Sequence, residues 1–86
     1  MAKSKKSVLV RGDNLTNCSL VQASVAQVRG YCRDHRLAPA PIPPDVDAYA
    51  PCTLEMSEWQ DEAGRRTLRL QLLREDTVLC DAEWAL

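Results

Sequence analysis

SLVQASVAQVRGYCRDHR, residues Ser19 to Arg36, is the only stretch of the chain with a sustained helical period. Its apolar positions recur every three or four residues, which places them in one stripe along an α-helix. The stripe contains Cys18, Val21, Val25, Val28, Cys32 and His35. We therefore expect a helix that packs this stripe against a core. Ser19 followed by Gln22 matches a capping box, which predicts that the helix begins at Ser19.

A second stripe on the same helix is basic. Arg29, Arg33 and Arg36 follow one another at spacings of four and three residues, within the last two predicted turns. Cations there interact favourably with the negative end of the helix dipole, an effect of about 0.3–1 kcal/mol each. Gly30 interrupts the helix at a cost of about 1 kcal/mol relative to Ala, and it predicts a bend or a close backbone approach.

Length and composition indicate one small domain. The chain has 86 residues, enough for a single modest core. It contains no run of about 20 apolar residues, so no membrane-spanning helix is predicted. The basic start MAKSKK is followed by too few apolar residues for a signal peptide. The intervals between Cys18, Cys32, Cys52 and Cys80 match no disulfide framework, so we predict a cytoplasmic protein with reduced thiols.

Strands are predicted from alternation and from turn residues. Residues 1–7 are polar and Lys-rich, and we expect a flexible basic tail. Ser7–Arg11 is rich in β-branched residues and is followed by turn-forming residues at 12–14, so it is predicted as the first strand. Residues 38–51 contain all five prolines and form an extended Pro-rich connection. Three alternating strands follow between Cys52 and the last residue.

The pairing of these strands follows from their faces, because residues opposed across a ladder lie on the same face. A five-residue loop at 60–64 sets Leu54 opposite Leu70. An odd-length turn or a bulge near Glu75 and Asp76 sets Leu72 opposite Cys80. The other predicted inner pairs are Met56 with Leu68, Leu70 with Ala82, and Leu68 with Trp84. Charged residues complete the lattice: Glu55, Arg69 and Glu83 in a row on the outer face, and Glu58 near Arg66 on the inner edge.

The predicted fold is therefore α+β with the order β-α-β-β-β. One long helix packs on one face of a mainly antiparallel sheet of three to four strands. Residues 8–86 form this single domain, with the Pro-rich connection inside it. Val8 and Val10 belong to the fourth strand, at an edge of the sheet or beside the other three.

Few residues are candidates for chemistry. Cys32 and His35 form the only close pair of metal-binding or nucleophilic residue types, and both continue the apolar stripe, which favours a structural role. Cys32 also lies near the negative end of the helix, where a thiolate is disfavoured. The chain has one His and no Gly-rich phosphate loop. We predict no catalysis, no cofactor and no metal, with a thiol or metal protein as a minor alternative.

The uneven distribution of charge suggests a second hypothesis. Residues 1–36 carry seven Lys or Arg and two Asp, whereas residues 37–86 carry four Arg and ten Asp or Glu. Compensation between the two halves is the favoured interpretation, and a basic surface for nucleic acid is the alternative. The residues that would follow a phosphate backbone are Lys3, Lys5, Lys6, Arg11, Arg29 and Arg33.

The leading hypothesis is a small non-catalytic protein–protein interaction module, an adaptor or inhibitor-like binder of a larger partner protein. Trp59 near a hairpin loop and beside Arg65 has the composition of an interface hot spot. The last strand, as an edge, offers open backbone groups for strand addition or for a homodimer. The predicted partner-binding residues are Arg29, Arg33, Arg36, Trp59, Arg65 and Trp84.

Overall fold

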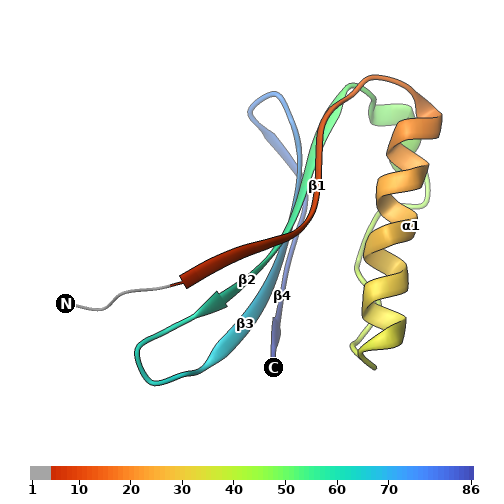
Figure 1. Ribbon diagram of the computed structural model, residues 1–86. Coiled ribbons are helices and arrows are strands. Elements are labelled where there is room, and N and C mark those ends of the chain that lie inside the picture. The colour runs from red at the N-terminus through yellow and green to blue at the C-terminus, as the bar shows by residue number, and fades with distance from the viewer. Residues whose placement is uncertain (1–4) are drawn as a thin grey trace.

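The computed structural model describes residues 5–86 and consists of one helix layered on one sheet (Figure 1). Its elements are β1 (Lys5–Leu15), α1 (Cys18–Asp34), the 3₁₀ turn η1 (Val46–Tyr49), β2 (Cys52–Gln60), β3 (Arg66–Arg74) and β4 (Thr77–Ala85). The strands form one antiparallel sheet in the order β1-β2-β3-β4. The predicted α+β class is confirmed, although the helix has only 17 residues. Within residues 5–86, neither helical segment is long and apolar enough to cross a membrane.

The N-terminal cap of the helix is Asn17 and not Ser19. Asn17 has an extended backbone, and its side-chain oxygen accepts a hydrogen bond from the Leu20 amide at 3.0 Å. Ser19 therefore lies inside the first turn, and the predicted capping box with Gln22 does not start the helix. Both residues have good capping chemistry, but only Asn17 precedes Cys18, the first residue that the helix includes.

The C-terminal end of the helix is a Schellman motif, in which the chain reverses through a left-handed residue. Arg36 is that residue, with φ of +56°. Its amide donates to the Arg33 carbonyl at 3.2 Å, and the Leu37 amide donates to the Cys32 carbonyl at 2.8 Å. The helix thus ends at Asp34, and Arg36 does not continue the basic stripe of Arg29 and Arg33 as predicted.

The apolar stripe is also shorter at both ends than the sequence predicts. Val21, Val25, Val28 and Cys32 are buried against the sheet, but Cys18 and His35 are exposed. Gly30 makes no close backbone approach, since a Cβ built there would meet only the Arg33 side chain, at 3.8 Å. That part of the Gly30 prediction is wrong.

Strand β1 is longer than predicted in both directions. It begins at Lys5, inside the segment expected to be a flexible tail, and continues through residues 12–14 to Leu15; Met1–Ser4 lie outside the described residues. A bulge at Leu9 places Val8 opposite Ser57 on the outer face and Val10 opposite Met56 on the inner face. Gly12 lies beside the helix, and a Cβ at this position would come within 2.9 Å of the Ser24 hydroxyl oxygen.

The β2–β3 hairpin has a different register from the predicted one. Leu54 pairs with Leu72 and Met56 with Leu70, a shift of two residues. The loop lies one residue later, because Asp61 and not Gln60 closes it. The Asp61 amide donates to the Arg65 carbonyl at 3.0 Å, and its carboxylate accepts from the Arg65 amide at 2.9 Å. Gly64 has the positive φ expected of it, +82°.

The β3–β4 hairpin pairs largely as predicted. Leu72 is opposite Cys80, and the predicted pairs of Leu70 with Ala82 and Leu68 with Trp84 are confirmed. The irregularity is a bulge between Leu72 and Leu73, followed by a two-residue turn at Glu75 and Asp76. The bulge carries Val78 to the position opposite Leu73, so that Val78 does not share the inner face with Cys80.

Both layers contribute to one core. It lies between the inner face of the sheet and the helix, and the connection adds Ile42 and Val46 to it. The side chains with no exposed surface are those of Val21, Val25, Val28, Leu54, Met56, Leu68, Leu70 and Leu72. Within residues 5–86, no helix covers the opposite face of the sheet (Figure 1).

Candidate protein-binding site

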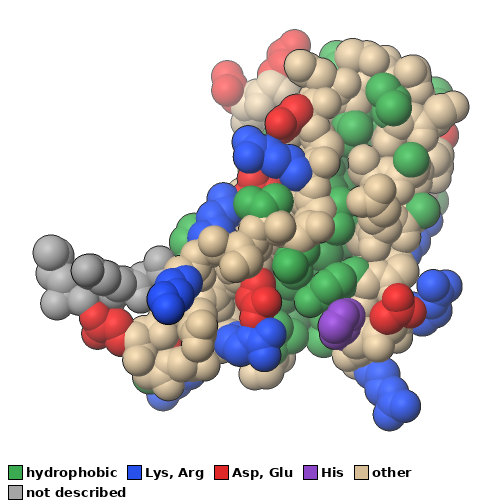
Figure 2. All heavy atoms as spheres, in the orientation of Figure 1, with side chains coloured by type: hydrophobic (Ala, Val, Ile, Leu, Met, Phe, Trp, Pro, Cys, Tyr) green, Lys and Arg blue, Asp and Glu red, His purple; other side chains and the backbone are tan. Residues whose placement is uncertain are grey.

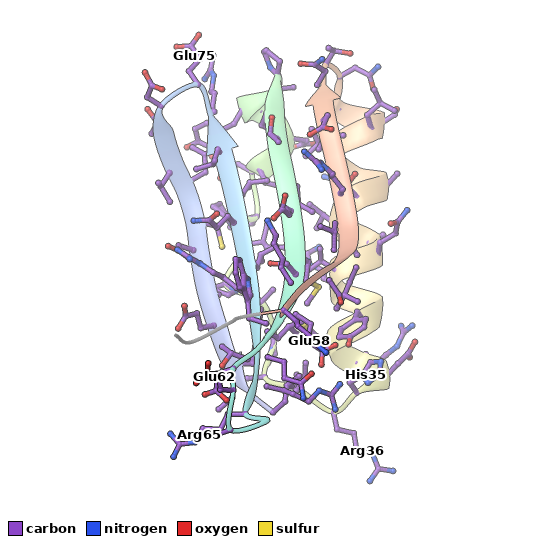
Figure 3. The ribbon with its side chains drawn as sticks, turned by 60° about the vertical axis from the view of Figure 1, so that its left-hand side comes forward. His35, Arg36, Glu58, Glu62, Arg65 and Glu75 are labelled. Carbon is purple, nitrogen blue, oxygen red and sulfur yellow. The ribbon has the colours of Figure 1, made fainter. Side chains whose placement is uncertain are left out.

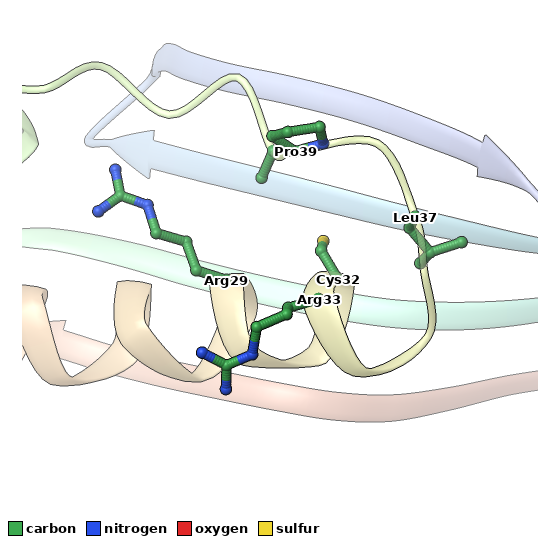
Figure 4. A pocket seen from close by; sticks show the side chains of 6 residues that line it. Arg29, Cys32, Arg33, Leu37 and Pro39 are labelled. Carbon is green, nitrogen blue, oxygen red and sulfur yellow. The ribbon is translucent and has the colours of Figure 1, made fainter.

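A cleft lies between the last half of α1 and the segment that leaves it (Figure 4). Its volume is about 400 Å³. The Schellman motif turns the chain back along the helix, and the prolines keep the following residues extended, so the connection forms the second wall. The lining residues are Arg29, Cys32, Arg33, Leu37, Pro39 and Ala40.

The floor of the cleft is apolar, and its thiol is buried and unreactive. Cys32 is only 3% exposed. Burial raises the pKa of the Cys32 thiol above its ordinary value, and a hydrogen bond with the Ala40 backbone opposes that shift without cancelling it. A neutral thiol behaves as a small hydrophobic group. The floor therefore suits an apolar side chain and not a charged one.

The rim of the cleft carries the two helix arginines. Arg29 and Arg33 are exposed, and both line the cleft together with Cys32 (Figure 4). Arg33 is 3.5 Å from the carboxylate of its neighbour Asp34, and that contact is largely solvent-exposed. Within residues 5–86, no carboxylate forms an ion pair with Arg29. The rim can thus bind a carboxylate next to an apolar anchor.

The other predicted binding residues are distributed over separate surfaces. Arg36 points away from the cleft beyond the helix end, and Arg65 lies at the tip of the β2–β3 hairpin (Figure 3). Trp84 is on the inner face, where its indole N–H donates to the Ala38 carbonyl at 3.0 Å. Trp59 is on the outer face, where its indole N–H donates to the Ser57 hydroxyl at 3.0 Å. The structure brings Arg29 and Arg33 together, and none of the others joins them.

The basic residues of the first strand do not extend the arginine rim. Lys6 is on the outer face, 2.5 Å from the Glu55 carboxylate and 5.3 Å from the centre of the Trp59 ring. Arg11 is on the same face, 3.2 Å from Asp13. Lys5 borders a polar hollow with Glu58 and Arg66. On the face seen in Figure 2, blue and red side chains are interleaved. Lys3 lies outside the described residues.

The thiols and the single His form no joint site. Cys32 is buried, whereas His35 caps the helix end and stacks on Tyr31 with ring centres 4.1 Å apart. Burial raises the pKa of the Cys52 and Cys80 thiols as well. Across residues 5–86, no three His, Cys, Asp or Glu side chains lie close enough together to hold a metal ion.

Three lining residues of the cleft, Leu37, Pro39 and Ala40, were absent from the sequence prediction. The available signal was the run of prolines directly after the helix, which forces an extended return path. No family model, curated protein or solved structure matches this chain.

Proposed function

We propose that this protein is a small, non-catalytic interaction module that binds an acidic segment of a partner protein in the Arg29–Arg33 cleft. One observation carries the proposal: an apolar cleft that contains the buried Cys32 is also lined by two arginines whose charges are weakly compensated. An apolar side chain of the partner enters the cleft, and carboxylates on either side of it meet the guanidinium groups.

The expected affinity is modest. Burying one aliphatic or aromatic side chain contributes about 1.5–3 kcal/mol, and a hydrogen bond to a charged group about 1.5–3 kcal/mol. Ordering the peptide and the arginine side chains offsets part of this gain. Before that offset, the two contributions sum to about 3–6 kcal/mol, which corresponds to a Kd between about 40 µM and about 6 mM for an isolated peptide. A larger partner strengthens the complex only through contacts beyond the cleft.

The proposed location is the cytoplasm. All four cysteines are unpaired thiols, and three of them are buried. Secreted domains of this size commonly depend on disulfides, whereas a reducing compartment keeps thiols free.

The test uses a fluorescent eight-residue peptide with a central Leu flanked by Glu, and measures its anisotropy on titration with the protein. We expect saturable binding that weakens at least tenfold in the Arg29→Glu/Arg33→Glu double variant. Replacing the peptide's Leu by Ala should weaken binding to a similar extent, because the floor is then unfilled. Arg29→Lys should retain part of the affinity, since the charge remains but the bidentate geometry is lost.

The control is Arg65→Glu, which makes the charge reversal of each single substitution at the hairpin tip (Figure 3), at a residue that does not line the cleft. It should leave peptide binding unchanged. An equal loss in this variant reduces the effect to overall charge and contradicts the proposal. A second contradicting result is an absence of peptide binding with retention of duplex DNA or RNA at about 150 mM salt. Loss of that retention in the Arg29→Glu/Arg33→Glu variant would favour the nucleic-acid hypothesis instead.

A further inference from the structure

Among the strands of residues 5–86, β4 forms an edge of the sheet and pairs only with β3. Figure 3 shows the four strands side by side, with β4 outermost on the side away from β1. The Leu86 amide donates to the Arg66 carbonyl at 3.0 Å, which fixes the alternation of the β3–β4 ladder. Ala82 and Trp84 direct their backbone groups to β3. Asp81, Glu83 and Ala85 direct theirs outward, and no backbone partner within residues 5–86 meets them.

The two edges of the sheet differ in regularity. Strand β1 has register shifts between Val8 and Val10 and again between Gly12 and Leu15. Such bulges disrupt an edge and hinder the addition of another strand. The stretch from Cys80 to Ala85 pairs with β3 without any shift. It therefore presents a regular backbone template that β1 does not.

The side chains of this edge alternate in character. Asp81 and Glu83 lie on the outer face, where Arg69 approaches both, at 3.5 Å and 3.9 Å. One positive charge thus faces two negative charges, so the outer side of the edge keeps a net negative charge. On the inner side, Cys80, Ala82 and Trp84 are apolar and pack against the core or at its margin.

We propose that the β4 edge accepts an extended segment of a partner protein in which basic and apolar residues alternate. Backbone hydrogen bonds from Asp81, Glu83 and Ala85 hold the segment, as in strand addition generally. Its basic side chains lie opposite the two carboxylates, and its apolar ones extend the inner face. A second copy of this chain fits poorly, because antiparallel pairing centred on Ala82 sets Asp81 opposite Glu83 of the copy.

The probe is a fluorescent peptide of four alternating Lys-Val pairs, titrated by anisotropy and followed by amide hydrogen exchange of the 15N-labelled protein. We expect binding, with new protection of the amides of Asp81, Glu83 and Ala85. A Glu-Val peptide of the same pattern should not bind. A peptide that groups the four lysines before the four valines should bind at least tenfold more weakly, because it cannot match the alternation.

Glu83→Pro separates backbone pairing from charge attraction. The Glu83 amide points outward and is not used by the fold, so proline is tolerated there but cannot donate to an added strand. We expect at least a tenfold loss of Lys-Val peptide binding in this variant and a smaller loss in Glu83→Gln, which removes only the charge. If Glu83→Pro does not fold, a Lys-Val peptide with alternate N-methylated amides supplies the same comparison on the wild-type protein.

Three results would overturn the proposal. Equal binding by folded Glu83→Pro, or by the N-methylated peptide, would exclude backbone pairing. Protection confined to other amides would place the peptide elsewhere. Concentration-dependent dimerisation with protection at residues 81, 83 and 85 would identify a second copy as the occupant. The Arg29→Glu/Arg33→Glu variant should bind the Lys-Val peptide normally, so this inference and the cleft proposal fail independently.

Discussion

The two faces of the sheet come from the same alternating strands, yet they are stabilised by different interactions. On the inner face, Leu54, Leu70 and Leu72 are completely buried under the helix and the connection. On the outer face, their sequence neighbours remain half-exposed and meet one another through ion pairs, such as Lys6 with Glu55. Burial removes apolar surface from water on one side only. The stability of the protein therefore depends mainly on the inner face, and substitutions on the outer face should be tolerated.

On the helix side of the sheet, two glycines differ in the space around them. Gly12 lies on the inner side of β1, in contact range of the helix, whereas Gly30 lies on the helix with open space beside its backbone. The first has no room for a methyl group, and the second has room but no need for flexibility. The same substitution should consequently change the stability in opposite directions at these two positions.

The largest expected effect comes from leucine truncation on the two faces of one strand. Leu70→Ala, in the centre of the inner face, should lower the free energy of unfolding by about 2–5 kcal/mol, because it leaves a cavity in a packed core. Leu73→Ala, on the half-exposed outer face, should cost less than about 1.5 kcal/mol, since little buried surface is lost. Urea unfolding followed by Trp fluorescence measures both. Equal losses would show that the outer face is covered in solution.

Glycine substitution gives the next largest effect. Gly12→Ala should destabilise the protein by about 1–3 kcal/mol, because the new Cβ overlaps the side chains of Leu15 and Ser24. Gly30→Ala should stabilise it by about 0.5–1 kcal/mol, since Ala favours the helix and meets no obstacle. The shift in the midpoint of thermal unfolding reports both signs. If Gly12→Ala stabilised the protein, β1 and the helix would have to lie further apart in solution than they do in this structure.

Alternation predicted the inner residues of β2 and β3 correctly, and helical period predicted the four buried residues between the ends of the stripe, because each depends only on local geometry. Strands β2 and β3 keep their inner residues inside even though the β2–β3 register is shifted by two, since an even shift preserves the face of every side chain. The register itself depends on which residue closes the loop. Asp61 does so through its own carboxylate, a side-chain interaction that period cannot reveal.

The limits of β1 and of the cleft were not predictable for a related reason. Gly12 is a residue type typical of turns, but it lies within strand β1. A glycine is needed there because the Ser24 side chain is close to its backbone, a contact that only the tertiary structure provides. Arg29 and Arg33 were identified from their spacing alone. The second wall of the cleft is formed by the connection with Leu37 and Ala40, which returns along the helix only because Arg36 adopts a left-handed conformation. Arginine has no intrinsic preference for that conformation, so the reversal left no clear signal.

The smallest expected effect concerns the Lys6–Glu55 ion pair on the outer face. Lys6 is 39% exposed in its side chain and Glu55 is 25% exposed, so water and salt weaken their attraction. Lys6→Met alone also removes the contact of the ammonium group with the Trp59 ring, so its effect overstates the pair. A double-mutant cycle with Glu55→Gln removes that contribution and should give a coupling energy of about 0.2–1 kcal/mol. The coupling should decrease when urea unfolding is repeated in about 1 M NaCl, where the screening length falls to about 3 Å.

A coupling above about 2 kcal/mol that is insensitive to salt would require a pair shielded from solvent. It would therefore contradict the open outer face on which the comparison of the two faces depends.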